Sequence, residues 1–207
     1  MRILFLGNSF TFYNALENMV SLMLDEPCFA VTRGGSTIAE HINPETEMGR
    51  RTAEMLADRN WDYVVLQEQS FAPAGTPDAF LASAAEACRL IHEAGATPVF
   101  FNTWAYEDGS EKLAGTGLTY DEMLTALNTS YTKAAAAGNA LRACVGDAFK
   151  RAKDIAPLYM ATDNYHPSLA GSYLAALTIA RIIAPGKEIT YVPAMLDKKI
   201  AKKLQEA

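Results

Sequence analysis

The sequence predicts an α/β fold in which helices cover both faces of a five-stranded parallel sheet. Short apolar runs alternate along the chain with longer amphipathic segments, as expected for repeated strand–helix units. The runs are nearly continuous in apolar character, which is typical of strands buried on both faces. No Pro/Gly-rich linker or block of like charge divides the 207 residues, and this length can bury one sizeable core. We therefore expect a single domain over residues 1–207.

Five runs have the length and composition of buried strands. The first ends at Gly7-Asn8 and the second at Gly34-Gly35-Ser36, where glycine permits a tight turn. The expected strands are Arg2–Leu6, Cys28–Arg33, Asp62–Gln67, Thr97–Asn102 and Leu141–Val145.

The segments between these strands show helical periodicity. Apolar residues recur three and four positions apart between Leu16 and Leu24. Pro77 opens a long helix that Gly95 stops, and Ser168 is the expected N-cap of another. The polar segment Tyr106–Thr119 is expected to form a surface loop or lid. The expected helices are Tyr13–Leu24, Thr46–Arg59, Pro77–Ala94, Tyr120–Ala137, Asp147–Ile155, Ser168–Ile183 and a lysine-rich tail over the last dozen residues.

Charge and composition argue against several classes of partner. The formal net charge is −6 and no run of lysine or arginine occurs, which argues against nucleic acid. No stretch approaches the roughly 18 apolar residues of a membrane span, so we expect no membrane partner. Cys28, Cys88 and Cys144 form no C-x-x-C pair, so we expect reduced core thiols and no metal. The apolar start is too short for a signal peptide. We expect a cytoplasmic protein, with secretion as the alternative if a leader precedes this sequence.

Ser9 lies just after the first expected strand, in Gly7-Asn8-Ser9-Phe10-Thr11, and just before a helix. A helix N-terminus offers free N–H groups that can stabilise a developing oxyanion. The other interpretation is an ordinary N-cap serine. The G-x-S-x-G elbow of α/β-hydrolases is not met, because position 11 is threonine.

Asp163 and His166 lie three residues apart in Asp163-Asn164-Tyr165-His166-Pro167, before the helix that Ser168 caps. This spacing lets one turn present both side chains to the same site. An aspartate can then orient the imidazole, which acts as the base that a serine nucleophile needs. The other interpretation is a pair of surface loop residues. His92 is expected at the surface late in a helix, and His41 is expected to be structural or to line a pocket.

Several polar groups follow expected strands and should meet at one edge of the sheet. Ser9, Gly35, Gln67 to Gln69 and Asn102 all have this position, and open parallel sheets bind ligands at the carboxyl ends of their strands. Gly35 would let a backbone N–H approach a ligand closely, or serve a plain turn. A glutamine amide here could donate to an oxyanion.

Together these motifs resemble the SGNH or GDSL hydrolase family. Gly7-Asn8-Ser9-Phe10-Thr11 resembles the first block of that family, whose serine is the nucleophile. Arg33-Gly34-Gly35-Ser36-Thr37 resembles the second block, and Asp163-x-x-His166-Pro167 the last. The resemblance runs from Arg2 to about Ile183. It implies a three-layer α/β/α sandwich with the flavodoxin-like strand order 2-1-3-4-5, a catalytic Ser9, Asp163 and His166, and no cofactor.

One block departs from the family pattern. The family usually carries G-x-N-D after the third strand, where the asparagine is an oxyanion donor, but here the segment is Leu66-Gln67-Glu68-Gln69-Ser70. Some carbohydrate-esterase branches of the family place a glutamine in this block. By this analogy the oxyanion hole would consist of the Ser9 and Gly35 N–H groups and the Gln69 amide, with Gln67 as second choice.

The expected activity is a serine esterase that hydrolyses small acyl esters, preferably acetyl esters on carbohydrates. Asn8, Trp104 and Phe71 are the expected substrate-binding residues, and Trp104, Phe71 and Tyr106 could stack on a sugar ring or merely pack at the rim. The alternative enzyme is a short-chain acyl or lysophospholipid esterase, or a thioesterase. Alternatives of another class are a flavodoxin-like module that binds phosphate or FMN, and a non-catalytic carbohydrate-binding relative. The expected partner is a small-molecule ester.

Overall fold

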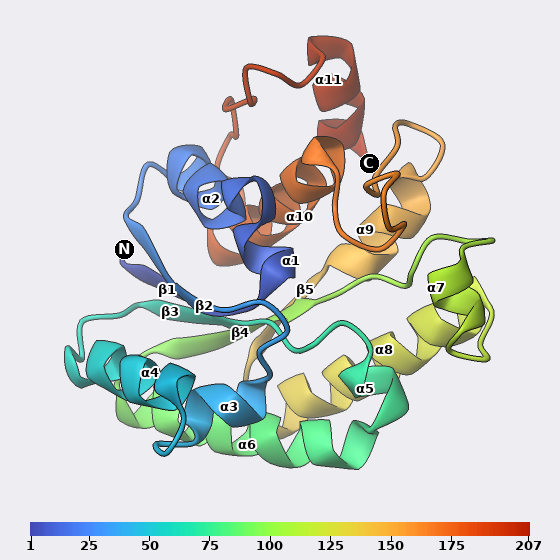
Figure 1. Cartoon of the computed structure of the whole chain (residues 1–207). Helices are drawn as coiled ribbons and strands as arrows, with labels where there is room; N and C mark the ends of the chain where they lie inside the picture. Colours follow the sequence, from blue (N-terminus) through green and yellow to red (C-terminus); the bar gives the residue numbers. More distant parts are fainter.

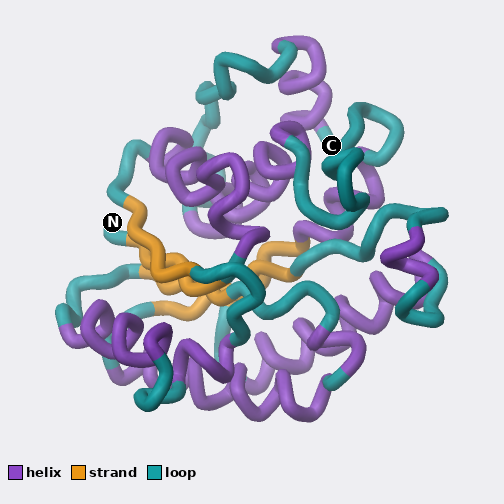
Figure 2. Tube along the Cα trace, viewed as in Figure 1, coloured by secondary structure: helices purple, strands orange, loops and turns teal.

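Five strands form one parallel sheet with the order β2-β1-β3-β4-β5. The computed structural model describes residues 1–207, and helices cover both faces of the sheet (Figures 1 and 2). In the register of the sheet, Leu6 pairs with Val31 on one side and with Leu66 on the other. The predicted fold class and strand order are confirmed. The strands are β1 (Ile3–Gly7), β2 (Cys28–Thr32), β3 (Tyr63–Leu66), β4 (Thr97–Asn102) and β5 (Leu141–Cys144).

Alternation along the strands creates two apolar cores. Ile3 and Phe5 of β1 point into the larger core, whereas Leu4 and Leu6 point into the core on the opposite face. The larger core is covered by α1 (Ser9–Phe12), α2 (Leu16–Leu24), α9 (Val145–Ala152), α10 (Leu169–Ile183) and α11 (Lys198–Glu206). The opposite face carries α3 (Ile38–Ile42), α4 (Glu47–Ala57), α5 (Ala72–Gly75), α6 (Pro77–Glu93) and α8 (Tyr120–Ala137).

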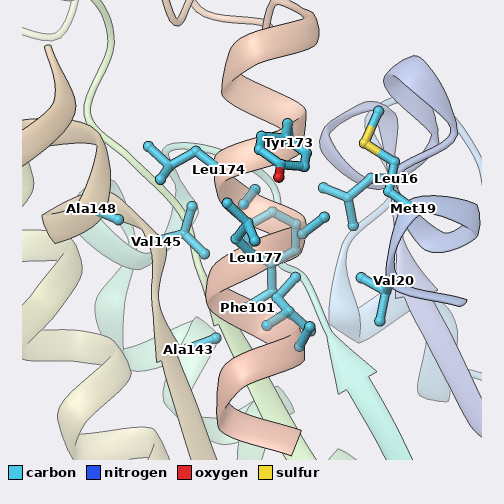
Figure 3. Packing of buried hydrophobic residues seen from close by; sticks show 14 of the residues in the cluster. Leu16, Met19, Val20, Phe101, Ala143, Val145, Ala148, Tyr173, Leu174 and Leu177 are labelled. Carbon is cyan, nitrogen blue, oxygen red and sulfur yellow. The ribbon is translucent and has the colours of Figure 1, made fainter. Parts of the chain in front are cut away.

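Helix α10 is the centre of the larger core. It lies between α2 and α9 and is buried over most of its surface, which accounts for its apolar sequence. Figure 3 shows Leu174 and Leu177 of α10 between Val145 of α9 and Val20 of α2. No helix combines the length and apolar character needed to cross a membrane.

The helices differ from the prediction mainly where they are short or bent. The expected helix Tyr13–Leu24 is divided, because Asn14 and Ala15 adopt left-handed backbone with φ of 55° and 53°. Its helical part is α2, from Leu16, and a separate short helix, α1, precedes it and begins at Ser9 itself. The short helices α3, α5 and α7 (Glu111–Ala114) were not predicted, and α7 lies within the expected loop Tyr106–Thr119. Helix α9 begins at Val145, earlier than the expected Asp147.

The order of the strands creates a crevice at their carboxyl ends. Strands β1 and β3 are neighbours, but the connection after β1 leads to β2 on one side whereas the connection after β3 leads to β4 on the other, so the two loops diverge. Such a switch point is the usual ligand site of open α/β sheets. The loops after β1, β2 and β3 bring Ser9, Gly35 and Gln69 to this crevice.

Candidate active site

Ser9, His166 and Asp163 form a continuous chain of hydrogen bonds. His166 Nε2 lies 2.9 Å from Ser9 Oγ, and His166 Nδ1 lies 2.8 Å from Asp163 Oδ2. The acceptor at Nδ1 is a carboxylate, so this nitrogen carries the proton and Nε2 is left as an acceptor for the serine hydroxyl. The two sequence motifs, 157 residues apart, thus meet in the arrangement that lets a base take a serine proton.

The surroundings of Asp163 keep it ionised. Its partial burial would raise the pKa of the carboxyl, but hydrogen bonds from the His166 side chain and from the N–H groups of His166 and Tyr165 outweigh that effect and lower the pKa. The imidazole is nearly buried, with 9% of its residue surface exposed. The carboxylate of Asp163 therefore lies fixed against a nearly buried imidazole, the arrangement by which an aspartate orients a histidine base.

The loop that carries Ser9 is held by hydrogen bonds to two other loops. Asn8 caps α1 by accepting from the Phe10 N–H, and its Nδ2 donates to Ser36 O at 2.8 Å. Ser36 Oγ in turn donates to Gly7 O at 2.7 Å. Gln67 Oε1 accepts from the Asn8 N–H at 2.9 Å. These bonds fix Ser9 relative to the ends of β2 and β3.

Position 7, at the start of the segment Gly7-Asn8-Ser9, has room only for glycine. A Cβ at Gly7 would lie 2.4 Å from Thr11 Oγ1 and 2.8 Å from Gln67 Oε1. Both atoms belong to a mutual hydrogen bond of 3.0 Å and cannot move apart without breaking it. The close approach of these side chains to the backbone therefore requires glycine.

Donors for an oxyanion are present on three loops. The N–H groups of Ser9 and Gly35 make no hydrogen bond within the protein, and both residues line the cleft beside His166. Gln69 also lines the cleft, and its Nε2 has one long contact, 3.4 Å to Ser70 Oγ. Gln67 is fully buried, and its amide is used by Asn8 and Thr11. Of the two candidate glutamines, Gln69 therefore retains a donor.

A buried carboxylate links two of these donor loops. Glu68 is 2% exposed, and its oxygens accept from the Gln69 N–H at 2.6 Å and from the Ile38 N–H at 3.2 Å. No cation lies within ion-pair distance of it. Burial raises the pKa of Glu68 to about 7, although both N–H bonds act in the opposite direction.

The cleft has a volume of about 340 Å³, and three of its aromatic side chains were not singled out in the sequence. Tyr13 stacks on the His166 ring with centroids 4.5 Å apart, and Tyr165 contacts the same ring at 4.0 Å. Phe12 is exposed at the rim. The position of Tyr165 directly before His166 was a usable signal, whereas nothing in the sequence singles out Tyr13.

The left-handed kink after α1 positions Tyr13. Asn14 Nδ2 donates to Ser172 Oγ at 2.9 Å and to Pro167 O at 3.2 Å. Pro167 follows His166 directly, so Asn14 ties the serine segment to the histidine loop. Backbone strain of this kind is commonly retained at functional sites.

The expected substrate contacts of Trp104 and Phe71 are wrong, and Tyr106 takes the packing alternative. Trp104 is fully buried, stacked between Phe10 at 4.4 Å and Phe149 at 4.1 Å, and cannot meet a sugar. Tyr106 is 2% exposed, and its hydroxyl is hydrogen-bonded to Ser70 Oγ. Phe71 packs with a small cluster beneath the expected lid and against Gly75, outside the cleft.

The other polar residues considered in the sequence, Asn8, His41 and His92, do not offer a free side chain to the cleft. Asn8 does line the cleft, but it is 3% exposed and its amide is committed to the protein. His41 is buried away from the cleft, within 3.1 Å of Thr52 Oγ1, and His92 lies at the surface. No group of three or more His, Cys, Asp or Glu side chains is placed to hold a metal ion.

Comparison with known proteins assigns the family. No family model and no curated protein matches the sequence. Among solved structures, a protein from Slackia heliotrinireducens assigned to the SGNH hydrolases is 40% identical, with a TM-score of 0.85 over 89% of this chain and 99% of that one. A DUF4886 family protein from Bacteroides uniformis is 22% identical, with a TM-score of 0.81 over 100% and 92% of the two chains.

The fold also occurs in the acetylxylan esterase Axe2 from Geobacillus stearothermophilus. That enzyme is 15% identical, with a TM-score of 0.64 over 92% of this chain and 97% of the enzyme. The level of identity to the Slackia protein, over nearly its whole length, goes beyond a shared fold. The chain therefore belongs to the SGNH/GDSL hydrolases, a family of enzymes that act on ester bonds.

Proposed function

We propose that residues 1–207 form one serine esterase domain in which Ser9 is the nucleophile, His166 the general base and acid, and Asp163 the residue that orients His166. The observation that carries this proposal is the pair of hydrogen bonds from Ser9 Oγ to His166 Nε2 and from His166 Nδ1 to Asp163. A flavodoxin-like module that only binds phosphate or FMN would not require a serine hydrogen-bonded to a histidine–aspartate pair.

The reaction proceeds through an acyl-enzyme. Ser9 Oγ attacks the ester carbonyl carbon while its proton passes to His166 Nε2. The carbonyl oxygen becomes an oxyanion, held by the N–H groups of Ser9 and Gly35 and by Gln69 Nε2. When the C–O bond to the alcohol breaks, His166 gives its proton to the leaving oxygen. Water then attacks the acyl group, His166 takes a proton from the water and returns it to Ser9 Oγ, and the acid departs.

A short acyl group, preferably acetyl on a carbohydrate, is the proposed substrate. The cleft of about 340 Å³ is lined around Ser9 by backbone and polar groups of Gly34, Gly35 and Gln69. Four of its twelve lining residues are hydrophobic, which favours a short acyl group over a long apolar chain. Tyr13 and Phe12 replace Trp104 as the rings that a sugar could meet.

The test is hydrolysis of 4-nitrophenyl acetate by the wild type, Ser9→Ala and a control, Ser21→Ala. Ser21 lies on α2, where its hydroxyl donates to Glu26 O, so its loss leaves the cleft unchanged. We expect Ser9→Ala to lose turnover and Ser21→Ala to retain it. Fluorophosphonate labelling followed by peptide mass spectrometry should place the adduct on Ser9. Equal rates for the wild type and Ser9→Ala would refute the nucleophile.

A chain-length series tests the substrate class. We expect kcat/KM to fall from 4-nitrophenyl acetate through the butyrate to the octanoate. A rise along the series would favour the lipid esterase alternative, while leaving the role of Ser9 intact.

A further inference from the structure

The electrostatic character of the cleft differs from that of the rest of the molecule. The chain has 24 acidic residues against 18 basic ones, a net charge of −6. None of the acidic residues lines the cleft around Ser9, and one lysine does, Lys112 of α7. A lysine in the lining of a concave site attracts anionic ligands there.

The ammonium group of Lys112 is held above two tyrosine rings. Its Nζ lies 4.5 Å from the centroid of Tyr165 and 5.6 Å from that of Tyr106. Tyr165 also contacts the His166 ring at 4.0 Å. One aromatic ring therefore separates the ammonium group from the proposed base.

The short helix that carries Lys112 is anchored to the protein. Ser110 Oγ accepts from the Leu113 N–H at 3.1 Å, and the Leu113 side chain is buried in the small cluster that includes Tyr106. Leu113 follows Lys112 directly, so the position of the lysine backbone is fixed at the edge of the cleft. A cation held over aromatic rings is positioned without losing its hydrogen-bond donors.

Lys112 also lacks a carboxylate partner. Arg33, next to the cleft, is paired with Glu40, and Lys150 is paired with Asp121, but no carboxylate lies within 4.0 Å of Lys112. Its three N–H donors are thus free for a ligand in the cleft. The aromatic contacts alone do not neutralise its charge.

We propose that Lys112 is a specificity residue that selects esters carrying an anionic group close to the scissile bond. This inference rests on the proposed esterase function and narrows its substrate class to an acyl ester with a carboxylate or a similar anion. The anion can belong to the acyl part or to the alcohol part, since both must pass through the same cleft.

Two pairs of matched esters test this proposal and separate the two sources of the anion. The first pair is 4-nitrophenyl hydrogen glutarate and its neutral methyl ester, which differ in charge on the acyl part. The second is 4-acetoxybenzoate and methyl 4-acetoxybenzoate, which differ in charge on the alcohol part, with acetate release as the readout. The variants are Lys112→Gln, Lys112→Arg and the control Lys133→Gln. Lys133 is exposed on α8, outside the cleft, and its substitution changes the net charge equally.

We expect Lys112→Gln to lower kcat/KM about tenfold, equivalent to about 1.4 kcal/mol, for the anionic member of one pair and less than twofold for its neutral partner. Lys112→Arg should retain most of the preference, Lys133→Gln all of it, and 0.5 M NaCl should weaken it by screening. The pair that responds identifies the part of the ester that bears the charge.

Two results are decisive against the inference. If the wild type hydrolyses these esters through Ser9 but Lys112→Gln affects charged and neutral members equally, Lys112 has no role in selection and the esterase proposal stands. If Ser9→Ala matches the wild type on all four esters, the proposed function itself fails and the inference falls with it.

Discussion

Replacing the buried Glu68 by glutamine should remove a pH dependence of folding stability. Glu68 accepts two backbone N–H bonds but faces no cation, and Glu40 on α3 adds a like charge. Burial raises its pKa from 4.5 to about 7. A glutamine has the shape and neutrality of the protonated acid, so Glu68→Gln mimics the low-pH form of the wild type.

The magnitude follows from the two pKa values. Between the unfolded value of 4.5 and the folded value of about 7, the folded state holds a proton that the unfolded state has lost. The stabilising contribution is therefore complete below pH 4.5 and is lost as the pH rises through about 7. A shift of this size corresponds to about 3 kcal/mol. In Glu68→Gln the NH₂ group of the amide cannot accept a hydrogen bond, so one of the two backbone N–H groups loses its acceptor. This loss of stability is the same at every pH and therefore cancels when two pH values are compared.

The assay is urea unfolding at pH 5 and pH 8, followed by the fluorescence of the buried Trp61 and Trp104. We expect the stability of Glu68→Gln relative to the wild type to rise by 1–3 kcal/mol, to order of magnitude, between the two pH values. The control is Glu122→Gln on α8. Hydrogen bonds from the Thr119 N–H and hydroxyl lower the pKa of Glu122, so its substitution should bring no gain at pH 8. If the difference in unfolding free energy between Glu68→Gln and the wild type is the same at both pH values, the conclusion that Glu68 is a buried carboxylate without a cationic partner is refuted.

Further predictions concern the site and the kink beside it. Asp163→Asn should lower kcat roughly 10⁴-fold while the unfolding midpoint changes little, because the imidazole loses its orienting carboxylate; near-normal kcat would contradict its role. Gln69→Ala should lower kcat roughly 10²–10³-fold without loss of stability, because it removes an oxyanion donor. Gln67→Ala should instead lower the free energy of unfolding by about 1–3 kcal/mol, since it leaves the buried Asn8 N–H unpaired. The reverse pattern would exchange the two assignments. Ala15→Gly should raise the free energy of unfolding by about 0.5–1 kcal/mol, because Ala15 has a φ of 53°; a loss of stability on thermal melting would show that this backbone is not strained.

The fold could be predicted because its long elements carry strong periodic patterns. Helix α8 has the predicted bounds Tyr120–Ala137, since a capping box at Thr119 and the glycine Gly138 mark both ends. The four- and five-residue helices α3, α5 and α7 are too short to show periodicity. The kink at Asn14 and Ala15 was not predicted, because alanine has no preference for left-handed backbone. The kink is supported instead by tertiary hydrogen bonds from Asn14 to Pro167 and Ser172.

The contact of Ser9 with His166 could be predicted from two motifs, but the lining of the cleft could not. An aromatic residue after a strand can turn toward the ligand or fold back beneath the sheet edge. For Trp104 the second outcome is favoured, because Phe10 and Phe149 offer stacking on both of its faces and Tyr165 O accepts its Nε1–H at 3.0 Å. Those partners come from three distant segments, so the local sequence of Trp104 carries no sign of them.

The glutamines after β3 show the same limit at the level of single hydrogen bonds. In a regular strand Gln67 and Gln69 would point to the same side, but β3 ends at Leu66 and the alternation ends with it. Gln67 is drawn inward by the Asn8 N–H and the Thr11 hydroxyl, whereas Gln69 Oε1 accepts from the Phe71 and Ala72 N–H groups. The second arrangement uses the carbonyl oxygen of the amide and leaves its NH₂ group nearly unused. An oxyanion needs a donor that no protein group has already taken, and the less satisfied amide of Gln69 supports our proposal that this residue takes the role expected of the family's asparagine.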